Sequence, residues 1–321
     1  MKSKPILIVA GDHKSIFYEI FFKALKFKKF KSPIIIIGSL KILKYFQKKI
    51  NYKKKIKLLN LKDINNYRLN NKEINLIDIE FLNRINDKGL NFQTKNYLKE
   101  CFDVSMKLLK SGLTNKFING PINKKEFLNK KFLGMTEYIS KKFNKKKTAM
   151  LIYNKNLSVC PVTTHLPIKL VSKKINKKII MEKAVLIDVF YKKNIGFRPK
   201  IAVTGLNPHC ESILKYNEDE KIIKPSITML RKRGLKISGP YAADTVFLKQ
   251  NREKFDVVLG MYHDQVLAPL KTLKEYDAIN ITLGLPFFRI SPDHGPNNLM
   301  VGKNYSNPLS LIQAINFLDK R

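Results

Sequence analysis

The sequence of 321 residues contains no tryptophan, only five histidines and only three cysteines. The cysteines, Cys101, Cys160 and Cys210, are odd in number and widely spaced, and no CxxC pair occurs. This usage argues against a disulfide framework and against a thiolate zinc site, and it is typical of a reducing compartment. We therefore expect a cytoplasmic protein.

Long apolar runs are also missing. A membrane-spanning helix needs about 20 consecutive apolar residues, and no segment approaches that length. The stretch Pro5–Gly11 near the N-terminus is apolar but short, and charged residues follow it. We interpret it as a first buried strand and a glycine turn rather than a signal peptide, and we expect no membrane partner.

Acidic residues are scarce: 25 Asp and Glu stand against 62 Lys and Arg, so the formal net charge is +37. Such a charge is typical of proteins that bind nucleic acid. The lysines are spread along the whole chain, however, and Asn and Ile are abundant too, which indicates A/T-rich codon usage. We expect no nucleic-acid partner, keep a basic nucleic-acid-binding protein as an alternative, and note that a basic field can attract a phosphorylated substrate.

No GxGxxG follows a strand, so the sequence gives no support for a Rossmann nucleotide site. Apolar strand-like runs instead alternate with amphipathic helical stretches. The expected strands are Ile6–Val9, Pro33–Ile37, Lys116–Ile118, Lys200–Val203, Phe255–Leu259 and Ala278–Ile281. The expected helices are Ile16–Phe27, Tyr97–Leu109 with an end cap at Gly112, Ile179–Tyr191, one that begins near Asn217, and Leu309–Leu318, whereas Lys53–Asn71 reads as a surface loop. This alternation predicts a parallel α/β sheet covered by helices, with ligands beyond the carboxyl ends of the strands.

Three of the five histidines follow strand-like runs or sit in the turns after them. They are His165 in Val162–Pro167, His209 in Leu206–His209, and His263 in Met261–Gln265. Three neutral imidazoles at such turns can converge on one divalent metal ion and leave positions open for substrate. Cys210, beside His209, is either a fourth ligand or a small buried hydrophobe.

Several short motifs in register carry a resemblance to a known family. They are Gly120–Lys124, Thr136–Tyr138, Val162–Pro167, Gly205–His209, Gly239-Pro240 with Ala243–Thr245, Met261–Lys271, Asn280–Pro286, Arg289 and Asp293–Gly295. In their order and spacing over nearly the whole chain, the sequence resembles the 4-hydroxythreonine-4-phosphate dehydrogenases of vitamin B6 synthesis, the PdxA family.

The resemblance implies an α/β fold of two α/β/α domains, like that of the isocitrate and isopropylmalate dehydrogenases. We expect residues 1–130 and 297–321 to form the first domain and residues 131–296 to form the second, which carries the metal ligands. The active site is expected in the cleft between them. The family is normally homodimeric with a shared active site, and it binds NAD without a GxGxxG motif.

The family's residue roles carry over to matching positions. The resemblance implies His165, His209 and His263 as ligands of zinc, magnesium or cobalt. It implies substrate contacts from Thr136, Lys271, Asn280 and Arg289, and we expect catalytic roles for Lys271 and Asp244. Asp264 is a candidate for orienting His263, and we leave the cofactor-binding residues unassigned. His294 lies in a family motif without a role, and we interpret His13 as incidental.

The implied reaction is the oxidation of 4-phosphohydroxy-L-threonine by NAD or NADP with a divalent metal. The product, 2-amino-3-oxo-4-phosphooxybutanoate, then decarboxylates to 3-amino-2-oxopropyl phosphate. One departure bears on the substrate: the family has histidine before Thr136, and this chain has Met135. Oxidation of 4-phosphothreonate or 4-phosphoerythronate is therefore an alternative, and a phosphate acyltransferase is an alternative of another class.

Overall fold

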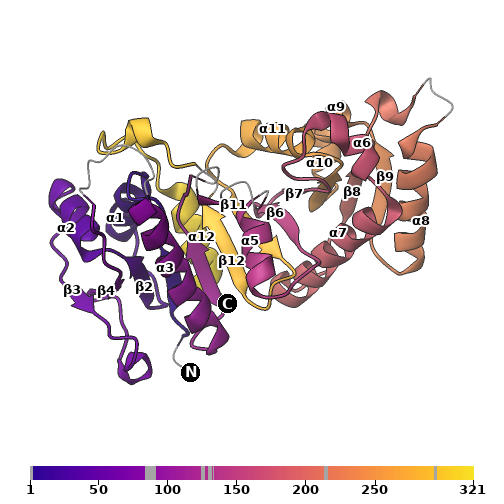
Figure 1. Cartoon of the computed structure of the whole chain (residues 1–321). Coiled ribbons are helices and arrows are strands. Elements are labelled where there is room, and N and C mark those ends of the chain that lie inside the picture. The colour runs from indigo at the N-terminus through magenta and orange to yellow at the C-terminus, as the bar shows by residue number, and fades with distance from the viewer. Residues whose placement is uncertain are drawn as a thin grey trace. The chain divides into compact units, whose positions relative to one another are not determined.

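The computed structural model describes residues 3–83, 92–123, 127–128, 132, 134–212, 216–292 and 295–321. The chain forms two compact units (Figure 1), unit 1 from Met1–Tyr138 with Pro286–Arg321 and unit 2 from Ile139–Leu285. Within the described ranges, no helix combines the length and the apolar character that crossing a bilayer requires.

Unit 1 is built on parallel strands. In sheet order they are β3 (Ile56–Leu58), β4 (Ile74–Asp78), β2 (Ile34–Gly38), β1 (Ile6–Val9), β5 (Lys116–Asn119) and β12 (Phe288–Pro292). Each neighbouring pair runs in the same direction, with Ile8 of β1 opposite Ile36 of β2 and Ile118 of β5. Strands β1 and β2 are buried throughout, which explains their continuous apolar sequences, because both faces of a parallel sheet are covered.

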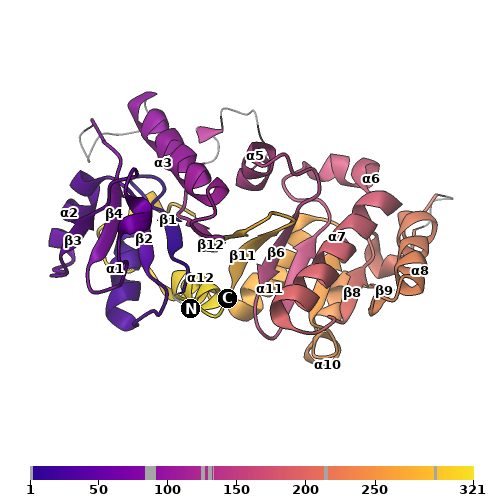
Figure 2. The same ribbon diagram turned by 90° about the horizontal axis from the view of Figure 1, so that it is seen from below.

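Helices cover both faces of the unit 1 sheet. Its helical elements are α1 (Phe17–Phe27), α2 (Leu40–Lys49), η1 (Ile64–Asn66), α3 (Phe92–Lys110), η6 (Asn298–Met300) and α12 (Leu309–Asp319), and α5 (Met135–Lys142) contains the unit boundary. Figure 2 shows α3 on one face of the strands and α1 and α12 on the other. The α/β/α layering that the sequence predicted is confirmed for this unit.

Unit 2 has one antiparallel strand. In sheet order the strands are β11 (Ile279–Leu283), β6 (Ala149–Tyr153), β7 (Ser158–Pro161), β10 (Val257–Gly260), β8 (Ile201–Thr204) and β9 (Ile237–Tyr241). Strand β6 pairs antiparallel with β11 and β7, whereas the pairs from β7 to β9 are parallel. The expected parallel pairing is therefore confirmed for β7, β10, β8 and β9 and was wrong for β6. The reason is the short connection Asn154–Leu157 between β6 and β7, which permits only a hairpin and not a crossover.

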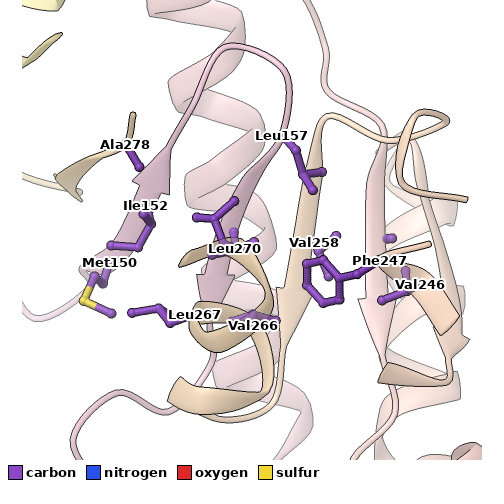
Figure 3. Close-up of a cluster of buried hydrophobic side chains, with 12 residues drawn as sticks. Met150, Ile152, Leu157, Val246, Phe247, Val258, Val266, Leu267, Leu270 and Ala278 are labelled. Atoms are coloured by element: carbon purple, nitrogen blue, oxygen red, sulfur yellow. The ribbon is translucent and has the colours of Figure 1, made fainter. Parts of the chain in front are cut away.

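The helices of unit 2 pack on its sheet around an apolar core. They are η2 (Ile168–Leu170), α6 (Val171–Lys174), α7 (Lys177–Phe190), η3 (Tyr191–Ile195), η4 (Pro208–Cys210), η5 (Asp219–Ile223), α8 (Lys224–Lys232), α9 (Ala243–Val246), α10 (Lys249–Arg252) and α11 (His263–Lys274). Helix α11 places Val266, Leu267 and Leu270 against side chains of the strands, among them Ile152 and Val258 (Figure 3). These contacts fix α11 and, with it, the residues of its first turn.

The expected bounds of one loop and of the two domains differ from those in the structure. The segment Lys53–Asn71 contains the short strand β3 at the edge of the unit 1 sheet, so its interpretation as loop was wrong in part. The unit boundaries fall at Tyr138 and Pro286, whereas the expected boundaries lie after residues 130 and 296. The second difference arises because β12 pairs with β5, with Arg289 opposite Phe117, which places β12 in the unit 1 sheet.

Candidate active site

The three histidines lie beyond the carboxyl ends of three neighbouring parallel strands. Strand β10 lies between β7 and β8, with Gly260 opposite Pro161 and Leu259 opposite Val203. His165 follows β7, His209 follows β8 and His263 follows β10, so the three loops leave the same edge of the unit 2 sheet. Loops at this edge are the usual ligand-binding positions of an α/β sheet.

The structure brings His165 and His263 together. Their ring centroids are 5.8 Å apart, with an interplanar angle of 38°. His263 is the first residue of α11, and its Nδ1 lies 2.6 Å from Oδ1 of Asp264. A hydrogen bond from Nδ1–H to this carboxylate leaves the Nε2 lone pair available for a metal ion, which is the orienting role expected of Asp264.

His209 is not part of a preassembled triad. Among the residues that the structure describes, no three His, Cys, Asp or Glu side chains are close enough together to hold a metal ion. His209 has φ 56° and Cys210 φ 62°, left-handed conformations that are uncommon for residues other than glycine. Such a backbone persists only where neighbouring contacts hold it.

Cys210 packs toward Gly205 at the start of the same loop. A Cβ built on Gly205 would lie 2.7 Å from Sγ of Cys210 and 2.6 Å from Oδ1 of Asp219, so only glycine fits there. Burial raises the pKa of the Cys210 thiol, and the negative charges of Asp219 and Asp244 raise it further. Because the protonated thiol is a poor ligand, this environment favours packing over metal binding for Cys210. Asp244 itself is exposed on α9.

Lys271 and Asn280 belong to the same unit as the histidines. Lys271 lies on α11, eight residues after His263, which is about 12 Å along a helix axis. Asn280 lies on β11, and its buried Oδ1 has no hydrogen-bond partner among the residues that the structure describes. An unsatisfied buried acceptor is rare in folded proteins, so this oxygen suits a donor group on a ligand.

Arg289 and Thr136 belong to unit 1. Arg289 is buried on β12, and its Nε donates a hydrogen bond of 2.8 Å to Oδ1 of Asn119. Burial lowers the pKa of Arg289 to about 10, although the carboxylate of Glu137 acts in the opposite direction. The guanidinium therefore stays cationic at neutral pH in a desolvated place, where it attracts carboxylate or phosphate strongly. Thr136 is half-buried at the start of α5, next to the buried Met135.

Unit 1 also contains two cavities lined by cationic side chains. One of about 230 Å³ is lined in part by His13, Lys14, Tyr45 and Lys49, and Lys49 also lines a neighbouring cavity of about 340 Å³. His13 is only 1% exposed, and its Nδ1 lies 3.1 Å from the Asp12 carboxylate. Its Nε2 has no hydrogen-bond partner within the described part of the chain. Although the sequence suggested an incidental role, the structure gives His13 a place in a cavity wall.

Several residues of the site region were not singled out from sequence. Thr163, Thr204, Asp219 and Gln265 hydrogen-bond to the histidine-bearing loops or to the residues that begin them. Asn119 is the partner of Arg289. The available signal was position, since each lies at the end of a strand or at the start of a helical turn. Lys124, Asp293 and His294, which belong to predicted motifs, lie outside the described residues.

Comparison with known proteins agrees with the sequence motifs. The model of the family "Pyridoxal phosphate biosynthetic protein PdxA" matches residues 29–318. A 4-hydroxythreonine-4-phosphate dehydrogenase of Sulfurihydrogenibium sp. (strain YO3AOP1) is 37% identical over 97% of this chain and 96% of the relative. A D-threonate 4-phosphate dehydrogenase of Salmonella typhimurium is 31% identical over 92% of each. The crystal structure of a 4-hydroxythreonine-4-phosphate dehydrogenase from Klebsiella pneumoniae has a TM-score of 0.82 and 28% identity over 98% of both chains.

Proposed function

We propose that this protein catalyses the NAD-dependent oxidation of 4-phosphohydroxy-L-threonine. The chain belongs to the PdxA family of pyridoxal phosphate biosynthetic proteins. The hydrogen on C3 leaves as hydride to the nicotinamide, and the hydroxyl proton goes to a base. The product, 2-amino-3-oxo-4-phosphooxybutanoate, is a β-keto acid that loses carbon dioxide to give 3-amino-2-oxopropyl phosphate. The observation that carries the proposal is the placement of three histidines beyond three neighbouring strand ends.

The donors proposed for a divalent metal ion are the imidazoles of His165, His209 and His263. In kind they fit, because neutral imidazoles suit zinc, cobalt and similar ions, and three protein ligands leave room for substrate. In geometry the separation of 5.8 Å between the rings of His165 and His263 supports a shared ion. When bound, the ion would stabilise negative charge on the substrate oxygen during oxidation and decarboxylation.

Four residues are proposed to contact the substrate. Arg289 and Lys271 are suited to the phosphate and carboxylate ends of the substrate, because both carry positive charge. The unpartnered Oδ1 of Asn280 is suited to a donor such as the substrate amino group or hydroxyl. Thr136 contributes a hydroxyl at the start of α5. Lys271 or a water molecule takes the hydroxyl proton, and Asp244 is proposed to orient that water.

The nicotinamide cofactor is proposed to bind unit 1 through its phosphates. The adjoining cavities of about 230 and 340 Å³ share Lys49 and Phe46, and lysine and histidine side chains suit a diphosphate in the absence of a glycine-rich loop. Nε2 of His13, buried and without a partner, can serve a ligand in the first of these cavities. NAD and NADP differ by one phosphate, and this cationic lining is compatible with both. A homodimer with a shared active site completes the proposal.

The deciding experiment is NAD reduction by the purified protein with 4-phosphohydroxy-L-threonine, measured with added divalent metal and again after chelation. We expect turnover that depends on the metal and that His263→Ala abolishes. His165→Ala and His209→Ala should lose metal binding in parallel with activity. No turnover by a folded protein that binds metal would contradict the proposed substrate.

A second substrate is favoured by one observation. Met135 is buried next to Thr136 where the family has histidine, and an apolar thioether cannot replace a hydrogen-bonding imidazole. The 31% identical relative is a D-threonate 4-phosphate dehydrogenase, so oxidation of 4-phosphothreonate is the second candidate. Comparing kcat/KM for the two substrates, in the natural protein and in Met135→His, separates them. The comparisons favour neither a phosphate acyltransferase nor a nucleic-acid-binding protein.

A further inference from the structure

The loops that carry the three histidines are joined by a set of hydrogen bonds to side chains that are not metal-ligand candidates. The first link connects the loops of His165 and His263. Both the backbone N–H and the side-chain Oγ1 of Thr163 donate to the carbonyl oxygen of Met261, at 3.1 and 2.7 Å. Thr163 is buried, so this double contact is shielded from competition by water.

The second link is made by one carboxamide. Oε1 of Gln265 accepts hydrogen bonds from the backbone N–H of Met261 at 2.7 Å and from Oγ1 of Thr204 at 2.8 Å. Nε2 of the same side chain donates to the carbonyl oxygen of Gly205 at 2.7 Å. Gln265 therefore bridges the end of β8, where the His209 loop begins, and the end of β10, where the His263 loop begins.

The backbone of Gln265 is held firmly, because the helix that carries it packs on the core. It lies in the first turn of α11, two residues after His263, and the next residues, Val266 and Leu267, are buried in the unit 2 core (Figure 3). Its bond to Met261 is a variant of the helix start in which a Gln side chain reaches back to a backbone N–H. One helical turn thus carries both His263 and the group that holds the neighbouring loop.

The His209 loop is held from a second side by Asp219. This fully buried carboxylate accepts hydrogen bonds from the N–H groups of Leu206 and Asn207, at 2.8 and 3.2 Å, and from Nδ2 of Asn207 at 2.8 Å. Asp219 fixes residues 206–207 within their own loop. Of the two side chains Asp219 and Gln265, Gln265 is the one that connects this loop to the His263 loop. The left-handed backbone at His209 makes such support necessary.

We propose that Gln265 is a positioning residue that sets the spacing between the His209 and His263 loops and thereby tunes metal affinity. This inference rests on the proposed metal-dependent function, and Gln265 itself is not a ligand. Outer partners that orient metal ligands typically change affinity about 10- to 100-fold when they are removed. Replacing the carboxamide by an apolar chain of similar length also leaves Gly205 O, Met261 N–H and Thr204 Oγ1 without this partner.

The test compares Gln265→Met with Gln250→Met, a control at an exposed position of α10. Each protein, freed of metal, is titrated with Co²⁺ while the visible absorption of the bound ion is followed. We expect Gln265→Met to bind Co²⁺ about 10- to 100-fold more weakly and with an altered spectrum, and Gln250→Met to match the natural protein. Thr204→Val removes a single bond to the carboxamide, so it gives a smaller change in the same direction should Gln265→Met not fold.

A second readout needs no metal. In the metal-free protein, the amide proton of Met261 should exchange with solvent faster in Gln265→Met than in Gln250→Met, because its acceptor is gone. Equal Co²⁺ affinity, spectrum and Met261 exchange in the two folded variants would overturn the inference. If the natural protein binds no divalent ion, the metal part of the proposed function fails, while faster Met261 exchange still supports the spacing role of Gln265 and unchanged exchange removes it.

Discussion

Arg289 shows how a single residue can be prepared for an anion by burial. Its side chain is 3% exposed, and its Nε donates a hydrogen bond of 2.8 Å to Oδ1 of Asn119. Burial lowers its pKa to about 10, because desolvation disfavours the cation more than the carboxylate of Glu137 favours it. A bound phosphate or carboxylate relieves that cost, so the same desolvation strengthens binding.

Arg289→Lys should lower kcat/KM for the phosphorylated substrate by about 10- to 100-fold, the value of a charged hydrogen bond of about 1.5–3 kcal/mol. Lysine keeps the charge but lacks the planar fork and the Nε donor to Asn119. The matched control is Arg233→Lys at an exposed position after α8, and steady-state kinetics with thermal melts separates lost contact from lost folding. Equal kcat/KM in both variants would place the substrate anion elsewhere.

At the scale of elements, sequence periodicity predicted six of the twelve described strands and five helical segments, and it did not predict how the strands pair. The apolar runs at Ile6–Val9 and Pro33–Ile37 predicted strands because buried parallel strands need apolar residues on both faces. Strand β6 was not among the predicted strands. Its reversed direction could not be predicted either, since hydrophobic patterning does not encode strand direction. The edge strand β3 is half-exposed and several lysines precede it, so its sequence resembles that of a surface loop.

A carboxylate at the end of α12 holds the residues that precede β2. Asp319 accepts hydrogen bonds from the N–H groups of Lys31 and Ser32, at 2.8 and 2.5 Å. Burial acts to raise the pKa of Asp319, but these hydrogen bonds and the charge of Lys116 outweigh it and lower the pKa below its ordinary value of 3.8. A carboxyl group with a depressed pKa in the folded state stabilises the fold above pH 3.8, and this contribution is lost as the pH falls through the folded-state pKa.

Asp319→Asn should therefore lower Tm at pH 7, and the difference from the natural protein should shrink as the pH falls below about 4. The reason is that both proteins then carry a neutral side chain at this position. Thermal unfolding across this pH range checks the prediction, with the exposed Asp63→Asn as the control. A Tm difference that stays constant with pH would mean that the charge of Asp319 is not the stabilising group.

At the scale of the whole molecule, the candidate site could be predicted only as a list of residues. The order and spacing of the motifs along the chain identified the histidines, Lys271, Asn280 and Arg289 as candidates. The parallel run of β7, β10 and β8 then explains why His165, His209 and His263 share one sheet edge. The supporting contacts of Asp219 and Gln265 could not be predicted, because they depend on loop geometry. The sequence does not show whether a glutamine or aspartate side chain is solvated or hydrogen-bonded to backbone groups.

The net charge of +37 should affect how readily the protein binds its substrate rather than the rate of the chemical step. A positive field attracts a phosphorylated substrate, and salt screens that attraction because the Debye length falls to about 10 Å at 0.1 M. KM for the phosphorylated substrate should therefore rise between about 0.02 and 0.5 M salt, with kcat nearly unchanged. Initial rates in salt series and in a matched sucrose series test this, and a KM indifferent to salt would assign the lysines no part in capture.

Unit 1 is assembled from both ends of the chain, and this arrangement has a consequence in time. As the polypeptide leaves the ribosome, β5 emerges early, but the strand that pairs with its second side, β12, begins only at Phe288. Unit 2, from Ile139–Leu285, is by then fully synthesised. During synthesis the second side of β5 therefore stays unpaired until β12 has emerged, after the whole of unit 2.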